Sequence, residues 1–230
     1  MNYPSKSPES GNVILYVLIG IFLVGLLTAA IRNVGGGNDN IDKENLLLKA
    51  GQVQRHAAEI AQGVNIILEK KASEADLRFA HDDAPSDYGL ITTTPEYQVF
   101  STEGGSATYR MPPAGVNDGS GWEIFATSAI PQVGSDKADL IAVLPNVTEA
   151  FCTVMNAQLG FDTGTQPTDD AAGSPSCVMG DPTDRFDGTF NDSSPNPLDD
   201  TTFSKLPAYQ ACVSCASNDT FNYYYVLMAR

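Results

Sequence analysis

VILYVLIGIFLVGLLTAAI, from Val13 to Ile31, is an apolar run that contains no charged residue. A helix needs about 20 apolar residues to cross a bilayer, and this run is close to that length. The chain after it is polar and acidic, and it holds all four cysteines. The run therefore predicts a transmembrane helix over residues 13–31 that anchors an exported domain, with residues 1–12 as a short leader or cytoplasmic segment.

The apolar run is better interpreted as a retained anchor than as a removed signal peptide. It is longer than a typical signal-peptide core, and Ile31 and Arg32 directly follow the small residues that would have to form a cleavage site. Lys6 on one side and Arg32 on the other leave the charge signal for orientation nearly balanced. The cysteines and the acidic domain favour a single-pass inner-membrane protein whose C-terminal domain lies in the periplasm or at the cell surface.

A pair of small residues, Gly25 and Ala29, lies within the apolar run. Such small-xxx-small pairs let a second helix approach closely in the membrane. They predict that the N-terminal helix packs against copies of itself in a homo-oligomer. The alternative is that the pair has no packing role, because glycine and alanine are frequent in membrane helices in any case.

A glycine-rich break over residues 32–40 separates the apolar run from an amphipathic helix predicted over residues 41–80. Three consecutive glycines, Gly35–Gly37, disfavour a helix that continues across the break. The apolar residues of the second helix recur in alternating steps of four and three, which indicates one buried stripe. The stripe comprises Leu46, Ala50, Val53, Ala57, Ile60, Val64 and Ile67. It can meet identical helices in an oligomer, but we expect it to face the core of its own chain.

Residues 81–230 are predicted to form an α+β head domain. Short β-rich runs, separated by Gly, Pro, Asn and Ser, indicate strands at Gly89–Thr94, Ala107–Met111, Trp122–Thr127, Asp139–Leu144 and Phe221–Ala229. One further helix is expected, with Asn146 and Glu149 as its capping box and Gly160 at its end. The predicted fold class is therefore α+β: an N-terminal transmembrane helix, an amphipathic helix, and an antiparallel sheet head with one further helix and disulfide-stapled loops.

The cysteines Cys152, Cys177, Cys212 and Cys215 predict two disulfide bonds, because an even number of cysteines in an exported domain indicates a disulfide framework. Four cysteines allow three connectivities. We favour Cys152–Cys177 with Cys212–Cys215, because loops of modest length close most simply. A bridge from Cys152 to the cysteines before the terminal strand is the alternative. The Cys-Val-Ser-Cys pair lacks the second close pair of a zinc site and the βαβ context of a thioredoxin-like centre.

The formal net charge of −15 argues against nucleic acid as a partner, because phosphate binding needs lysine and arginine. Acidity also has a simpler explanation, since it keeps an exported domain soluble. We therefore expect no nucleic-acid partner and assign no ligand to the acidic loops.

Catalytic and metal-binding patterns are not evident in the sequence. His56 and His81 are the only histidines and both precede most of the β-rich region, where a Ser-His-Asp or Cys-His site is therefore not expected. Asp181, Asp184 and Asp187 lie in a Gly/Pro-rich loop without the spacing of a calcium-binding loop, so we expect them to be solvated. The sequence predicts no enzyme activity, no cofactor and no metal.

The order of segments resembles that of type IV pilins and pseudopilins. A leader that contains Lys6 and ends at Gly11 precedes an apolar helix, an amphipathic helix and a head with cysteines. Leu144–Cys152, LPNVTEAFC, is similar to a segment of type IVb-like pilins. Glu9–Asn12, ESGN, and Tyr224–Arg230, YYVLMAR, are similar to the two ends of a group of alphaproteobacterial pilin-like proteins.

This resemblance implies that the leader is cut after Gly11, that Asn12 becomes the first residue, and that the apolar helix holds the subunit before it enters a helical filament. We therefore expect a membrane-anchored, pilin-like structural subunit that assembles through its N-terminal helix. The family has Glu at the fifth mature position, where this chain has Tyr16. That departure and the long acidic loop favour the alternative, a monomeric single-pass exported ligand-binding protein.

Overall fold

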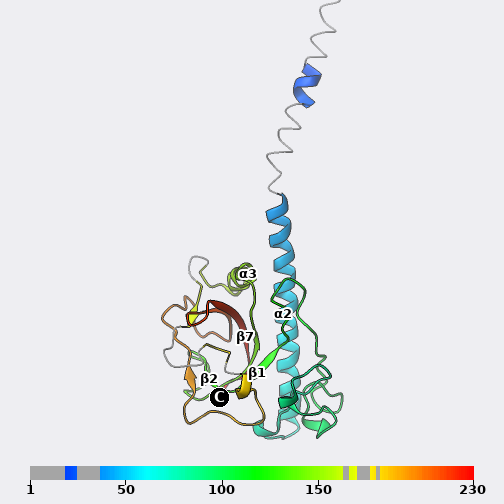
Figure 1. Ribbon diagram of the computed structural model, residues 1–230, viewed down its shortest axis with the longest axis vertical. Helices are drawn as coiled ribbons and strands as arrows, with labels where there is room; N and C mark the ends of the chain where they lie inside the picture. The colour runs from blue at the N-terminus through cyan, green and yellow to red at the C-terminus, as the bar shows by residue number, and fades with distance from the viewer. Residues whose placement is uncertain (1–18, 25–36, 163–165, 170–176, 180–181) are drawn as a thin grey trace, which may run out of the picture. The chain divides into compact units, whose positions relative to one another are not determined.

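A computed structural model describes residues 19–24, 37–162, 166–169, 177–179 and 182–230. The chain divides into two compact units, Met1–Glu44 and Asn45–Arg230. In the first unit, residues 19–24 are helical. The second unit is an α+β head in which helices pack on a mixed sheet (Figure 1).

The amphipathic helix predicted over residues 41–80 is found as α2, Gly37–Glu69. It begins inside the predicted break of residues 32–40 and ends earlier than expected. The end is set by Lys71, which has a φ of 69°, a left-handed conformation that cannot continue an α-helix. Just before it, Lys70 Nζ donates to the carbonyl oxygens of Glu103 and Gly104 at 3.0 and 2.9 Å, which ties the end of the helix to that loop.

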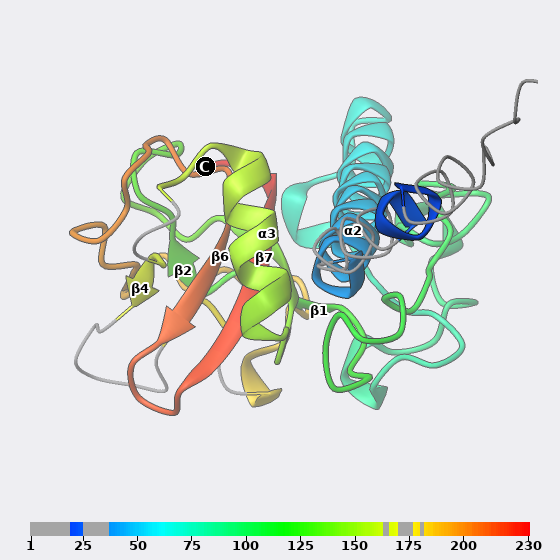
Figure 2. The ribbon, with the colours of Figure 1, turned by 90° about the horizontal axis from the view of Figure 1, so that it is seen from above.

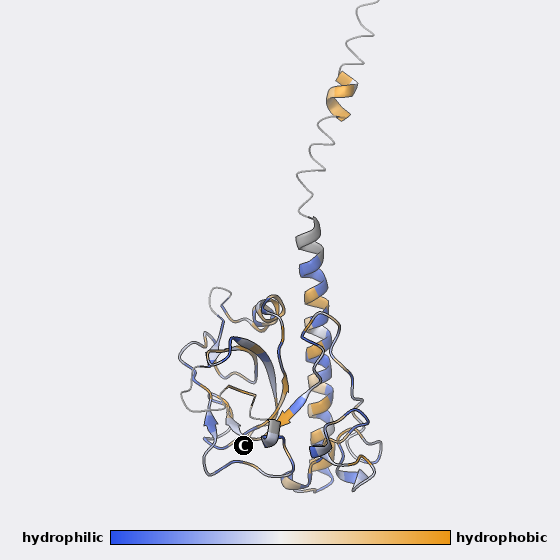
Figure 3. Cartoon of the chain, viewed as in Figure 1, coloured by the Kyte–Doolittle hydropathy of each residue, from blue (hydrophilic) through white to orange (hydrophobic). Residues whose placement is uncertain are grey.

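The apolar stripe of α2 packs within its own chain, which confirms that expectation from the sequence. Apolar and polar residues alternate along the helix in Figure 3, and the stripe residues face the core of the head. Six of the seven stripe residues are at most 1% exposed: Ala50, Val53, Ala57, Ile60, Val64 and Ile67. Leu46 is partly buried against the same core. This stripe is therefore not an exposed seam for identical helices.

The main sheet has five strands in the order β1-β3-β7-β6-β4. Their bounds are β1 Glu123–Phe125, β3 Leu140–Leu144, β4 Thr168–Asp169, β6 Gln210–Cys215 and β7 Thr220–Met228. The pairs β1–β3, β3–β7 and β6–β7 are antiparallel, but β4 runs parallel to β6. A second small sheet pairs β2, Ser128–Ala129, in parallel with β5, Asn196–Pro197. The sheet is thus mixed, which corrects the expected antiparallel arrangement.

Two buried clusters lie on opposite faces of the sheet. Along β3, Leu140, Ala142 and Leu144 join the cluster that contains α2 and the helix α3, Glu149–Leu159. Ile141 and Val143 join the other cluster, as expected because successive side chains of a strand point to opposite faces. Figure 2 shows α3 lying along β6 and β7. The second face is covered by loop residues, among them Ile130, Val133, Phe161, Leu198 and Phe203.

The helix expected after Pro145 is confirmed as α3, but its cap differs from the prediction. Thr148 is the N-cap, and its hydroxyl oxygen accepts a hydrogen bond from the backbone N–H of Phe151 at 3.3 Å. Asn146 instead adopts a left-handed conformation with a φ of 52°. Gly160 ends the helix at a φ of 82°, the conformation that favours glycine at this position.

Two of the predicted strands are wrong. Residues 89–94 form turns, because the buried amide of Gln98 donates to the carbonyl oxygens of Leu90 and Thr93 at 3.1 and 3.0 Å. Among the described residues, 107–111 pair with no strand: Ala107 donates its backbone N–H to the carbonyl oxygen of Val99, and Thr108 bonds to side chains of α2. The strands at Trp122–Thr127, Asp139–Leu144 and Phe221–Ala229 are confirmed as β1, β3 and β7. Among the described residues, 3-10 helices span Glu74–Asp76, Ser86–Tyr88, Pro95–Tyr97 and Pro182–Asp184.

Candidate functional site

All four cysteines form disulfide bonds, as predicted, but the favoured connectivity is wrong. The bonds join Cys152 to Cys212 and Cys177 to Cys215. Cys212 and Cys215 both lie on β6, three residues apart, so their side chains point to opposite faces of the sheet. Cys212 therefore meets α3 in one buried cluster, and Cys215 meets the loop residue Cys177 in the other. One bond therefore links α3 to β6, and the other links the loop on the opposite face of the sheet to β6.

The residues assigned to processing and helix packing lie outside the described residues. These are Gly11, Asn12, Gly25 and Ala29. In the part of the chain that the structure describes, no helix combines the length and the apolar character needed to cross a membrane.

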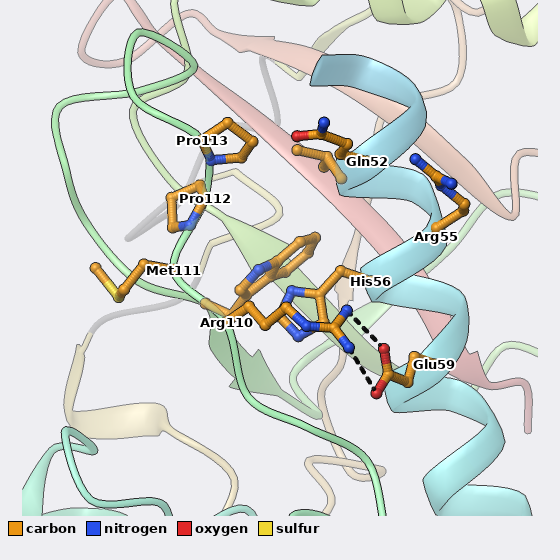
Figure 4. A pocket seen from close by; sticks show the side chains of 10 residues that line it. Gln52, Arg55, His56, Glu59, Arg110, Met111, Pro112 and Pro113 are labelled. Atoms are coloured by element: carbon orange, nitrogen blue, oxygen red, sulfur yellow. Dashed lines mark hydrogen bonds and ion pairs between the residues drawn. The ribbon is translucent and has the colours of Figure 1, made fainter. Parts of the chain in front are cut away.

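A cavity of about 460 Å³ lies on the head between α2 and the loop 110–113. From α2 it is lined by Gln52, Val53, Arg55, His56 and Glu59. The facing loop supplies Arg110, Met111, Pro112 and Pro113, and Trp122 precedes β1. Figure 4 shows His56 and Glu59 extending from α2 toward Arg110 on the loop. Sequence segments that lie far apart thus meet at one site.

The surroundings of His56 favour the neutral form of its ring. Its side chain lies 3.1 Å from the carbonyl oxygen of Thr108 through Nε2, and a carbonyl oxygen only accepts, so Nε2 carries the proton. Burial lowers the pKa of His56, and the nearby Arg110 guanidinium lowers it further. The neutral ring then presents Nδ1 as a hydrogen-bond acceptor.

Glu59 and Arg110 form a forked ion pair at the same site. Arg110 Nη1 lies 2.8 Å from Glu59 Oε2, and Arg110 Nη2 donates to Glu59 Oε1 at 3.3 Å. Glu59 Oε1 also accepts from the backbone N–H of Thr108 at 2.9 Å. Burial opposes ionisation, but these bonds and the Arg110 charge together lower the pKa of Glu59. The pair holds the loop against α2 while the carboxylate stays charged.

Two lining residues of the cavity, Trp122 and His56, belong to an aromatic cluster. The Trp122 ring meets the His56 ring edge-on, with centroids 5.6 Å apart, and Trp122 is only 3% exposed. Tyr109 stacks on His81 with centroids 3.5 Å apart and an interplanar angle of 12°. Among the described residues, the Trp122 Nε1 and His81 Nδ1 atoms are buried without a hydrogen-bond partner. Such atoms are uncommon in proteins and need an explanation.

Among the described residues, the aspartates of the Gly/Pro-rich acidic loop form no metal site. Asp184 and Asp187 are exposed, and Asp181 lies outside the described residues. Asp187 instead accepts the backbone N–H of Thr189 at 2.9 Å, a local loop contact. Within the described ranges, no three His, Cys, Asp or Glu side chains lie close enough together to hold a metal ion.

Sequence reasoning did not identify the cavity. It treated His56 only as a histidine outside the β-rich region, and it assigned no role to Arg110 or Trp122. The spacing along α2 could have shown that Gln52, His56 and Glu59 share one side of the helix. No local signal places the loop 110–113 opposite them.

In comparisons with known proteins, no protein-family model, curated protein or solved structure matches the chain.

Proposed function

We propose that the chain is a membrane-anchored, pilin-like structural subunit that assembles through its apolar N-terminal helix into a filament or envelope complex. The sequence order supports this proposal: a leader ending at Gly11, the apolar run of residues 13–31, an amphipathic helix and an exported head. In this proposal the anchor is a single transmembrane helix of the inner membrane, and the partners are copies of the same chain.

The burial of the α2 stripe is the observation on which the proposal depends. The head uses that stripe for its own core, so the stripe is not available as a seam for other helices. The longest apolar segment outside the head is the run Val13–Ile31. A subunit that contacts other copies through this run would assemble by its membrane anchor. Its head would then stay a separate folded unit.

The two disulfide bonds support the proposed location of the head. Disulfides persist in oxidising compartments such as the periplasm and the cell surface, and they are rare in the cytosol. Both bonds of the head are buried, and each joins a different covering layer to β6. We place the head on the periplasmic or outer side of the membrane for this reason.

The cavity at Trp122 favours a second candidate function, a monomeric single-pass exported ligand-binding protein. A concave site with apolar walls and a few charged groups is the usual form of a ligand pocket. The two candidates differ in whether the N-terminal helix associates with copies of itself.

Substitution of Gly25 by leucine tests the assembly role. Leucine is favoured in the bilayer, so Gly25→Leu should insert normally, but its bulk should block close approach of a second helix. We expect fewer cross-linked oligomers or filaments in membranes that contain this variant. Val24→Leu is the matched control, because it adds bulk to the neighbouring position off the small-residue pair.

Equal oligomer yield for Gly25→Leu and wild type would contradict the assembly role. So would a wild-type chain that is monomeric both in its membrane and in mild detergent. Either result would leave the monomeric ligand-binding protein as the better account.

A further inference from the structure

We propose that the cavity between α2 and the loop 110–113 binds a small carboxylate that carries an aromatic ring. The inference concerns the head alone and does not depend on whether the chain assembles. The volume of the cavity, about 460 Å³, lies within the range of small-molecule sites, which is about 300–1,000 Å³.

The walls of the cavity are suited to a flat apolar ring. Val53 and Trp122 are almost fully buried and form an apolar and aromatic surface. Pro112 and Pro113 face them with rigid rings and no backbone N–H that would need a partner. Met111 remains 51% exposed beside them, and its flexible thioether can pack on a ring that enters. An aromatic ligand would cover this exposed side chain.

The charged groups favour an acid over a base. The lining holds the guanidinium groups of Arg55 and Arg110 and only one carboxylate, Glu59, in a chain whose formal net charge is −15. Arg110 already neutralises Glu59 through their ion pair. Within the described residues Arg55 forms no ion pair, and its Nε donates only to the carbonyl oxygen of Gly51 at 3.2 Å. Arg55 is exposed at the edge of the cavity, and among the described residues it is the lining cation without an ion pair, so its side chain can turn toward a ligand carboxylate.

A further polar atom belongs to the same site. His56 adds an acceptor at Nδ1, since its Nε2 proton is used by Thr108. The lining therefore offers a site for a ring with polar substituents rather than for a plain hydrocarbon.

The single tryptophan of the chain makes this inference directly measurable. Trp122 is the only tryptophan, so tryptophan fluorescence, excited selectively over that of the tyrosines, reports on the wall of this cavity in the full-length protein in detergent. We expect phenylacetate to change that fluorescence saturably. Phenylacetamide has the ring without the charge and should bind more weakly, and acetate has the charge without the ring and should have no saturable effect.

Three variants separate the carboxylate contact from general charge effects. Arg55→Gln should weaken phenylacetate binding by about fivefold, as expected for one partly exposed ion pair, and should not change phenylacetamide binding. Glu59→Gln should strengthen phenylacetate binding, because it releases Arg110 while the amide oxygen can still accept from Thr108. Lys137→Gln removes a charge outside the cavity lining and should leave binding unchanged.

A fluorescence titration without saturation by phenylacetate would overturn the proposal. The same conclusion would follow if acetate had an equal effect, or if Arg55→Gln and Lys137→Gln reduced binding equally. These outcomes concern the cavity only, so they are distinct from a failure of the Gly25→Leu oligomer test.

Discussion

Side chains of α2 form hydrogen bonds with the backbone of Thr108, as a neighbouring strand would. Thr108 lies in a segment without regular secondary structure, and its backbone oxygen and N–H bond to His56 and Glu59 respectively. Gln98 has a similar role in the preceding loop, where its side-chain oxygen accepts the N–H of Ala80 at 3.0 Å. Buried backbone groups need partners, and here polar side chains supply them. These bonds hold the loop that forms one wall of the cavity.

The stacked histidine at residue 81 should make stability depend on pH. Burial lowers the pKa of His81, although the carboxylates of Asp82, Asp83 and Glu123 oppose this effect. A lowered folded-state pKa contributes stability that is present above the unfolded value of about 6.5 and is lost as the pH falls through the folded value. His81→Phe keeps an aromatic ring against Tyr109 and cannot titrate.

We therefore expect the melting temperature of the wild type to fall more than that of His81→Phe between about pH 7.5 and about pH 5.5. Calorimetry across this range measures the difference. Parallel decreases in the two proteins would show that the protonation of His81 is not linked to folding.

At the scale of elements, α2 packs on the loop 98–107 so closely that glycine is required. A Cβ at Gly105 would lie 2.6 Å from the carbonyl oxygen of Val99 and 2.7 Å from that of Gly63 in α2. Gly105→Ala should therefore cost about 1–3 kcal/mol of unfolding free energy, because backbone atoms must move. Gly51→Ala is the matched control: its Cβ would meet nothing within 4 Å, and alanine in a helix is favoured by about 0.5–1 kcal/mol.

Urea unfolding of the two alanine variants measures both effects. Stabilisation by Gly51→Ala together with destabilisation by Gly105→Ala is the expected pattern. If Gly105→Ala left the unfolding free energy unchanged, the contact between α2 and this loop would be looser than described.

The disulfides should each stabilise the head by about 2–4 kcal/mol, because they close long loops in the unfolded chain. Replacement of either pair by alanines should lower the melting temperature without preventing the other bond. Mass spectrometry of a non-reduced digest should find Cys152 linked to Cys212 and Cys177 linked to Cys215. A peptide with an internal Cys212–Cys215 bond would contradict this arrangement of β6.

The elements show which features a sequence pattern can predict. The stripe of α2 and the strand Phe221–Ala229 were predictable, because local periodicity and β-branched or aromatic content determine them. The connectivity of Cys212 and Cys215 was not, because β6 itself was not recognised as a strand. Once β6 is known, the alternation of its side chains excludes a bond between these two residues.

For the whole molecule, the cavity was not predictable, because its walls come from three separate segments. Residues 52–59, 110–113 and 122 meet only when the loop folds back on α2. The separate roles of the N-terminal run and the head are a proposal about the whole chain. The head uses the apolar stripe of α2 internally. In the proposal, the run Val13–Ile31 serves the membrane and assembly.

The mass of the mature N-terminus, measured on protein isolated from its native membrane, tests the pilin-like account most directly. The account predicts cleavage after Gly11, so that the mature chain begins at Asn12 and retains the apolar run. A Gly11→Leu variant should stay uncut and serves as the mass reference for the full leader. A wild-type chain that begins at Met1 would contradict the pilin-like account.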